Sequence, residues 1–213
     1  MLSKSARGVP TRRDEILAAA ADLFLAEGYG AASINRLIER TGGSKSTLYA
    51  MFGNKERLFA AVVESIVDET EDFISAAEIE SLSLRDGLVA IGERLIETAT
   101  SARHIALSRL VIAESPWFPE VGRIYHERTS ARFVRLIADF IASHDAPVVV
   151  ARPTEIAEMF TGMLLHHLLF ERFCDPGASL PPARMRRLTA QAARFVAEGL
   201  GGKRKLTKSG RRQ

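Results

Sequence analysis

Apolar residues recur at helical spacing through nearly the whole chain, beginning close to the N-terminus. The first helix face repeats at the i, i+4, i+7 and i+8 positions, which hold Ile16, Ala20, Leu23 and Phe24. Thr11 stands before this face with Asp14 three residues further on, a spacing typical of a capping box. We therefore expect a helix that starts after Thr11 and ends at Glu27-Gly28-Tyr29-Gly30, because glycine readily closes a helix in the left-handed conformation.

The same pattern predicts further helices to the end of the chain. Two short ones start at Ser33 and Ser44 and end before Gly42-Gly43 and Gly53, and Asn54 is a suitable N-cap for the next. The longer helices are expected at 55–77, 84–101, 103–115, 119–143, 154–173 and 182–199. Residues 144–152 form a connector in which three valines could be a short extended piece, and residues 201–213 should be disordered. Because strands do not alternate with these helices, the predicted fold class is all-α.

Composition narrows the class of protein. The chain has 213 residues, of which 46% are apolar and 26% charged, so it can bury a core in one or two domains. Apolar runs stay below the ~18 residues of a membrane span, and the first fifteen residues lack the apolar core of a signal peptide. We expect a cytoplasmic protein without membrane contact. The single cysteine, Cys174, excludes an internal disulfide and a multi-cysteine metal site.

Charge is distributed unevenly along the chain. Residues 1–60 carry a net charge of +3, residues 61–180 of −9 and residues 181–213 of +9. A basic N-terminal piece on an acidic body fits an anionic partner at one end, although an excess of this size is also found on ordinary protein surfaces. The basic C-terminal stretch is expected to be a solvated tail rather than a DNA-binding element.

Residues 33–52 carry the functional signal. Two short helices joined by a glycine-containing turn describe a helix-turn-helix. Hydroxyls, a cation and a tyrosine at the start and exposed side of the second helix suit phosphate oxygens and base edges. These residues are Ser44, Lys45, Ser46, Thr47 and Tyr49, and Lys55 at the start of the following helix is placed in the same way. The alternative is a plain three-helix cluster with polar loops.

The run from Thr11 to about Phe59 resembles the N-terminal domain of the TetR family of bacterial transcriptional regulators. The resemblance is carried by Phe24 and the Gly28-Tyr29 exit, by Ser33, by Ser44 to Tyr49, and by the Phe52-x-x-Lys55-Glu56-x-Leu58 entry to the next helix. Two positions depart from the family pattern. Gly43 replaces a small β-branched residue, which predicts a looser turn, and Ala50 replaces a larger polar or aromatic one.

This resemblance implies a DNA-binding domain at residues 10–57 and a helical effector-binding and dimerisation domain at residues 58–200. It implies that Ser33, Tyr49 and Lys55 contact phosphates, while Ser44, Lys45, Ser46 and Thr47 face the bases. It also implies a homodimeric repressor that binds a palindromic double-stranded operator and pairs through helices 154–173 and 182–199. The segment RLVIAESPWFPEVGRIYHERTSAR is similar to an AefR-like C-terminal subgroup.

A small apolar or aromatic effector is expected in the C-terminal domain, between the helix at 55–77 and those at 103–115, 119–143 and 154–173. The candidate contacts are Arg103, His104, Trp117, Tyr125, Phe160, Met163, His166 and Phe170.

Neighbouring His166 and His167 invite a metal site, but adjacent helical residues point about 100° apart. No nucleophile with a base, cofactor loop or paired carboxylates stands at recognisable spacing, so we expect neither catalysis nor a cofactor. An enzyme and a helical adaptor that has lost DNA binding are the alternative classes.

Overall fold

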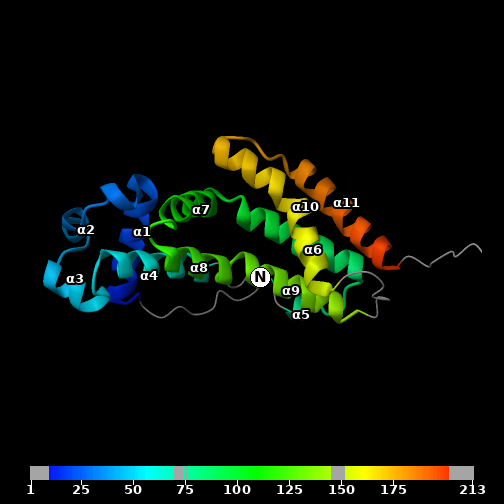
Figure 1. Ribbon diagram of the computed structural model, residues 1–213, viewed down its shortest axis with the longest axis horizontal. Helices are drawn as coiled ribbons and strands as arrows, with labels where there is room; N and C mark the ends of the chain where they lie inside the picture. Colours follow the sequence, from blue (N-terminus) through cyan, green and yellow to red (C-terminus); the bar gives the residue numbers. More distant parts are fainter. Residues whose placement is uncertain (1–9, 70–73, 75, 145–151, 202–213) are drawn as a thin grey trace, which may run out of the picture. The chain divides into compact units, whose positions relative to one another are not determined.

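The computed structural model describes residues 10–69, 74, 76–144 and 152–201, and the regular secondary structure within these ranges is helical, without a strand (Figure 1). The all-α prediction is confirmed. The helices are α1 (Arg12–Ala31), α2 (Ile34–Thr41), α3 (Lys45–Phe52), α4 (Lys55–Asp68), α5 (Ala76–Ile79), α6 (Leu84–Ala99), α7 (Ala102–Glu114), α8 (Pro119–Arg128), α9 (Ser130–Ala142), α10 (Pro153–Cys174) and α11 (Pro182–Gly201). Gly201, the first residue of the predicted disordered tail, instead ends α11. Residues 202–213 of that tail and most of the 144–152 connector, including its three valines, lie outside the described residues.

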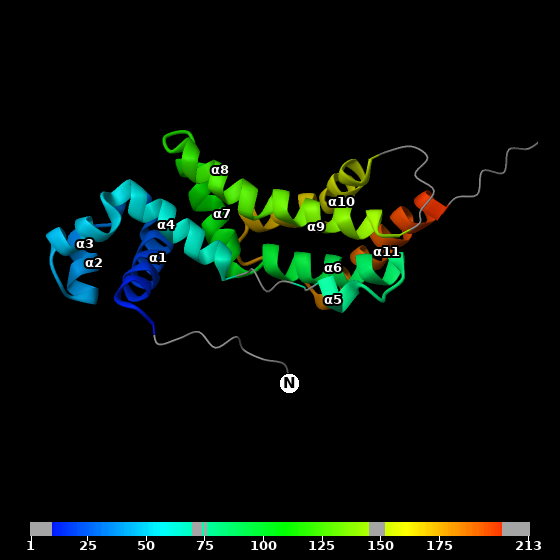
Figure 2. The same cartoon turned by 90° about the horizontal axis from the view of Figure 1, so that it is seen from below.

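The helices group into two compact units. The first contains α1 to α4, α7, α8 and the end of α10. Its core is built by the predicted apolar face of α1, on which Ile16, Ala20, Leu23 and Phe24 are all buried. Leu37, Leu48 and Phe52 are buried against this face, and Ile34 and Ile38 pack on it from the side. The helix-turn-helix is thus held by α1 and α4 (Figure 2).

Local caps set the helix starts. Thr11 Oγ1 accepts a hydrogen bond from the Asp14 backbone while the Asp14 carboxylate accepts one from the Thr11 backbone, so the predicted capping box is confirmed. The hydrogen bond from the Thr11 side chain lowers the pKa of Asp14. Asn54 caps α4 by accepting from the backbone of Arg57 at 2.8 Å. Gly28 breaks the regular path of α1 with φ = 80°, although helical bonding resumes as far as Ala31.

Two predicted helices are shorter than expected. The helix predicted at 55–77 ends at Asp68 with Glu69 as its C-cap, where these two carboxylates oppose the negative pole of the helix dipole. Residues 70–73 and 75 of the predicted helix lie outside the described residues. The helix predicted at 119–143 divides at Thr129, whose backbone turns to φ −111° and ψ −92°. The Thr129 hydroxyl donates to the carbonyl of Tyr125 at 2.6 Å, a local bond that competes with regular helix geometry. Apolar spacing alone detects neither interruption.

Aromatic side chains join α1 and α4 to the segment before α8 within the first unit. Phe24 lies edge-on to Phe59 with ring centroids 5.4 Å apart, and Tyr29 lies 5.0 Å from Phe59. Phe118 completes the cluster at 4.7 Å from Tyr29. Such pairs add to the energy gained from apolar burial. The helices next to the helix-turn-helix therefore share one continuous core with α7 and α8.

The second unit contains α5, most of α6 and α9, the first part of α10, and α11. Small residues let its helices approach closely. A Cβ on Gly92 of α6 would lie 2.6 Å from the side chain of Thr189 on α11 and 3.0 Å from Leu164 on α10. A Cβ on Gly87 would lie 2.0 Å from the ring of Phe140. The predicted apolar helix at 154–173 is thereby buried along one face.

Candidate nucleic-acid interface

Hydroxyl groups cluster at the start of α3. Ser44 Oγ accepts a hydrogen bond from the backbone of Thr47 at 3.2 Å, which makes Ser44 the N-cap of the helix. The same oxygen lies 2.7 Å from Ser46 Oγ and 3.0 Å from Thr47 Oγ1. These side chains and that of Lys45 are exposed to solvent. A helix start with exposed hydroxyls, a cation and the positive end of the helix dipole can bind phosphate oxygens and base edges.

The residues expected to contact phosphates lie on α3, at the N-cap of α2 and at the start of α4. Tyr49 of α3 is 39% exposed. Ser33 occupies the N-cap position of α2 but its side chain makes no capping hydrogen bond. Lys55 lies across the exit of α1, with Nζ 3.4 Å from the carbonyl oxygen of Gly30 and 4.6 Å from the centre of the Tyr29 ring. Burial lowers the pKa of Lys55, and the nearby charge of Glu114 acts in the opposite direction.

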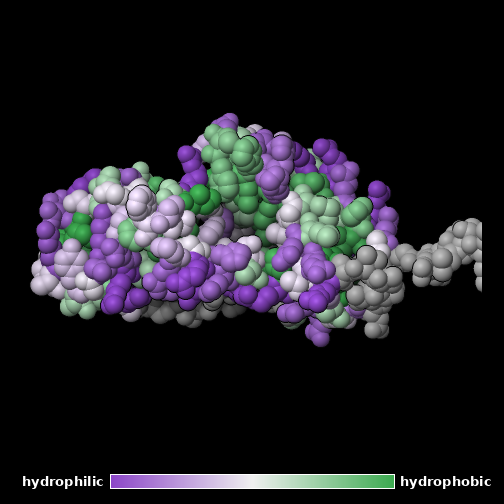
Figure 3. Space-filling view, viewed as in Figure 1, coloured by the Kyte–Doolittle hydropathy of each residue, from purple (hydrophilic) through white to green (hydrophobic). Residues whose placement is uncertain are grey.

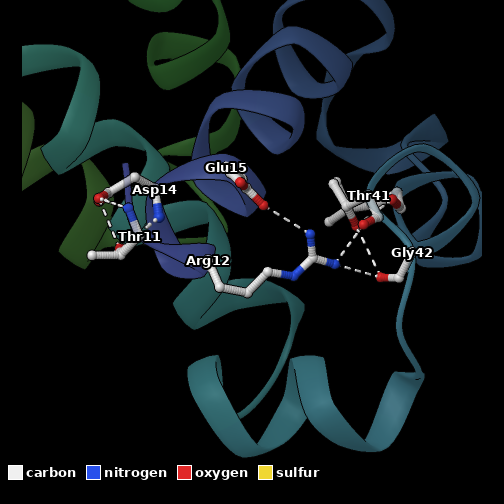
Figure 4. A network of polar contacts seen from close by, with 7 residues as sticks. Thr11, Arg12, Asp14, Glu15, Thr41 and Gly42 are labelled. Carbon is white, nitrogen blue, oxygen red and sulfur yellow. Dashed lines mark hydrogen bonds and ion pairs between the residues drawn. The ribbon is translucent and has the colours of Figure 1, made fainter. Parts of the chain in front are cut away.

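Sequence reasoning missed two neighbours of α3. Arg12, in the first turn of α1, donates hydrogen bonds to the carbonyls of Thr41 and Gly42 in the turn before α3 (Figure 4). Arg13 places its guanidinium 5.4 Å from the ring centre of Phe52, the last residue of α3. The sequence contained a signal for both contacts. Two arginines in the first turn of a helix are unfavourable beside the positive end of its dipole, which indicates that they interact with another part of the chain.

In the first unit, α7 and α8 meet through a half-buried polar chain. Tyr125 Oη lies 2.6 Å from Ser108 Oγ and 2.8 Å from His104 Nε2. Burial lowers the pKa of His104 and raises that of Tyr125, so both side chains are uncharged near neutral pH. Two of the predicted effector contacts, His104 and Tyr125, are therefore brought together. Arg103 instead lies 3.3 Å from Glu69, and Trp117 is 77% exposed.

The remaining predicted effector contacts are on α10. Phe160 is fully buried in the second unit, whereas Met163, His166 and Phe170 are exposed. Apolar side chains gather on the visible surface over α10 and α11 (Figure 3). There a hollow of about 440 Å³ is lined by Met163, Leu188, Gln191, Ala192, Arg194, Phe195 and Glu198. Met163 thus shares a surface with α11.

Comparison with known proteins identifies the family. Residues 16–62 match the model of bacterial regulatory proteins of the tetR family. Residues 86–198, more than half of the chain, match the C-terminal domain of AefR-like transcriptional repressors. The chain belongs to the TetR family. It is a DNA-binding transcriptional regulator with a helix-turn-helix, which confirms the resemblance seen in the sequence.

Individual relatives agree with this assignment. The chain is 38% identical over 107 residues to the HTH-type transcriptional repressor ComR of Escherichia coli, covering 46% of this chain and 50% of that protein. It is 36% identical over 97 residues to the repressor AcnR of Corynebacterium glutamicum, covering 45% and 47%. The chain thus spans about half the length of the curated relatives it matches. A solved TetR-family structure from Mesorhizobium loti is 26% identical, has a TM-score of 0.80, and covers 93% of this chain and 98% of that one.

Among the residues that the structure describes, none of the helices is long and apolar enough to cross a bilayer. Within the same residues, no three His, Cys, Asp or Glu side chains group in a way that could hold a metal ion.

Proposed function

We propose that this TetR-family regulator is a cytoplasmic repressor that binds a palindromic operator as a homodimer and is released by a small apolar or aromatic effector. Residues 10–57 form the DNA-binding domain and residues 58–200 bind the effector and the second subunit. The observation that carries DNA recognition is the exposed cluster of Ser44, Ser46 and Thr47 hydroxyls beside Lys45 at the start of α3.

The position of each polar group supports its role. Residues 44–47 lie in the cap and first turn of α3, where a recognition helix contacts base edges in the major groove. Tyr49 follows them on α3, and Ser33 at the start of α2 keeps its hydroxyl free of a capping bond. Lys55 at the start of α4 has three donors on its ammonium group, so it can contact a phosphate beside the carbonyl of Gly30. These three residues fix the protein on the DNA backbone.

A homodimer supplies the second recognition helix. One α3 reads only a few base pairs, so specificity needs two, and two-fold protein symmetry requires a two-fold operator with half-sites ~34–36 Å apart. Met159 and Met163 share one face of α10 within the second unit and are 64% and 38% exposed. Phe195 of α11 is 71% exposed. Apolar exposure of this extent on neighbouring helices favours burial against a second copy.

A labelled duplex from upstream of the regulator's own gene tests DNA recognition by fluorescence anisotropy. We expect binding at least ~10³ tighter than to a scrambled duplex of equal length. Lys45→Ala should reduce this preference, whereas Arg186→Ala, which removes an exposed cation on α11, should preserve it. Equal binding to both duplexes would favour the adaptor or the enzyme instead.

The effector proposal rests on the polar pair His104 and Tyr125 within an otherwise apolar core. Ligand pockets generally combine apolar walls with a few polar groups of this kind. By linkage, an inducer binds free protein more tightly than operator-bound protein by the same factor that it weakens DNA binding. A thermal-shift screen of apolar and aromatic compounds, followed by titration of a hit with and without operator, measures this factor. Identical affinities would show that the compound is not an inducer.

A further inference from the structure

The first turn of α1 contacts the turn that leads into α3. Nη2 of Arg12 donates to the carbonyl of Thr41 and, at 2.7 Å, to that of Gly42, while Nη1 pairs with Glu15 at 2.9 Å. These carbonyls belong to the last residue of α2 and to its C-cap, and the last carbonyls of a helix lack partners within it. Figure 4 shows the guanidinium reaching from α1 to both oxygens. Arg12 therefore completes the end of α2 from a different helix.

The turn needs such support because of its glycines. Gly42 has φ = 74° and Gly43 has φ = 97°, conformations that residues with side chains rarely adopt. Glycine also has the most backbone freedom to lose on ordering. A Cβ on Gly43 would lie 3.6 Å from Nη2 of Arg12, and one on Gly42 would lie 4.0 Å away. The guanidinium thus packs beside two residues that have no side chains of their own to hold the turn.

The turn and α3 are continuous, so its position decides where the recognition residues lie. Ser44, the N-cap of α3, follows Gly43 directly. At the other end of α3, Arg13 lies over the ring of Phe52 at 5.4 Å. Two adjacent arginines of α1 therefore contact the segments at both ends of α3. Rotation of the glycine turn would redirect the first turn of α3, including Lys45.

We propose that Arg12 is a positioning residue for operator recognition, which fixes the α2–α3 turn and through it the first turn of α3. This inference rests on the proposed role of α3 in reading the operator. Arg12 is itself 44% exposed, so the alternative is a direct contact between its guanidinium and a DNA phosphate. The two roles respond differently to salt, because each lost phosphate contact lowers the slope of log affinity against log salt by ~0.9.

Arg12→Lys and Arg12→Met separate these roles in operator-binding titrations at four salt concentrations. For a positioning residue, the affinity falls at least tenfold in Arg12→Met, because both hydrogen bonds from the charged guanidinium to the carbonyls of Thr41 and Gly42 are lost. It falls less in Arg12→Lys, which retains one donor, and the salt slope stays that of the unaltered protein in both. Wild-type affinity in Arg12→Lys together with a reduced slope in Arg12→Met would overturn the proposal in favour of a phosphate contact.

Hydrogen exchange of the DNA-free protein tests, without the operator, whether Arg12 fixes the α2–α3 turn. We expect Arg12→Met to increase exchange in residues 42–48 and to leave the rest of α1 unchanged. The matched control is Arg36→Met, which removes an exposed arginine paired with Glu27 at 2.7 Å outside the turn, and it should leave exchange in residues 42–48 unchanged. Unaltered exchange in 42–48, or a uniform rise over all of α1 to α3, would overturn the proposal. Failure of the unaltered protein to bind any operator would count against the proposed function. The exchange result would still show whether Arg12 orders residues 42–48.

Discussion

We expect Phe195→Ser to move the protein from dimer to monomer at concentrations where the unaltered chain is dimeric. Phe195 is 71% exposed on α11 and lines the hollow that Met163 of α10 shares. Burying a whole phenylalanine side chain contributes ~1.5–3 kcal/mol, so burying the exposed part contributes about 1–2 kcal/mol. The residue occurs twice in a symmetric dimer, which gives about 2–4 kcal/mol in total. The dimer dissociation constant should therefore rise between about 30-fold and about 700-fold.

Sedimentation velocity over a nanomolar to micromolar concentration series measures this dissociation constant directly. The matched control is Ile112→Ser, which removes an apolar side chain that is 59% exposed on α7 rather than on α10 or α11. Circular dichroism melts of both variants establish that they fold. Similar dissociation constants for Phe195→Ser and Ile112→Ser would refute the reasoning, because exposure of apolar surface would then not identify the interface.

Three further perturbations test other parts of the molecule. Lys55→Ala should weaken binding to every DNA and lower the slope of log affinity against log salt by ~0.9. Lys45→Ala or Thr47→Ala should instead change the preference among operator variants by ~1–3 kcal/mol. Equal, sequence-independent losses for all three variants in competition gel shifts would contradict these roles. Gly92→Ala places a Cβ 2.6 Å from a side chain of α11 and should cost ~1–3 kcal/mol by overpacking, so an unchanged denaturant midpoint would speak against the close approach. The lowered pKa of His104 means that the unfolded chain takes up its proton first as pH falls below ~6.5. Its contribution to stability is complete above that pH and is lost below it, and His104→Gln should show a smaller loss between pH 7.5 and 5.5 in denaturant titrations.

Local chemistry made the N-terminal helices predictable. A capping box such as Thr11 with Asp14 acts within four residues, and the N-cap Asn54 likewise bonds to Arg57 only three residues on. Apolar spacing also identified the buried side chains of α1, because an amphipathic helix has one face to bury. These signals need no information from distant parts of the chain, so the fold of the helix-turn-helix could be inferred from sequence.

Interruptions and long-range contacts were harder to predict. The division at Thr129 depends on a hydroxyl that bonds to the carbonyl four residues earlier, while the apolar spacing continues across it. Arg12 reaches residues 29 and 30 positions away, and neither spacing nor charge reveals which carbonyls it meets. The predicted effector contacts depend on several helices at once, and within the first unit a hydrogen bond brings together His104 and Tyr125.

The packing of the first unit indicates how an effector could act on DNA binding without a long α4. Arg128 at the end of α8 pairs with Asp68 of α4 at 2.6 Å, and Arg103 of α7 lies 3.7 Å from Asp22 of α1. Phe118 adds an apolar contact to the aromatic cluster of α1 and α4. Exposed ion pairs contribute little to stability, but together with a shared core they transmit displacement, because packed interiors deform little. If the proposed effector moves α7 against α8, α1 and α4 should shift with them. Only Gly53 and the N-cap Asn54 separate α4 from α3. The 14 residues of α4 span about 21 Å at ~1.5 Å each. This length is sufficient for the coupling, because α7 contacts α1 and α8 contacts α4, the two helices that hold the helix-turn-helix.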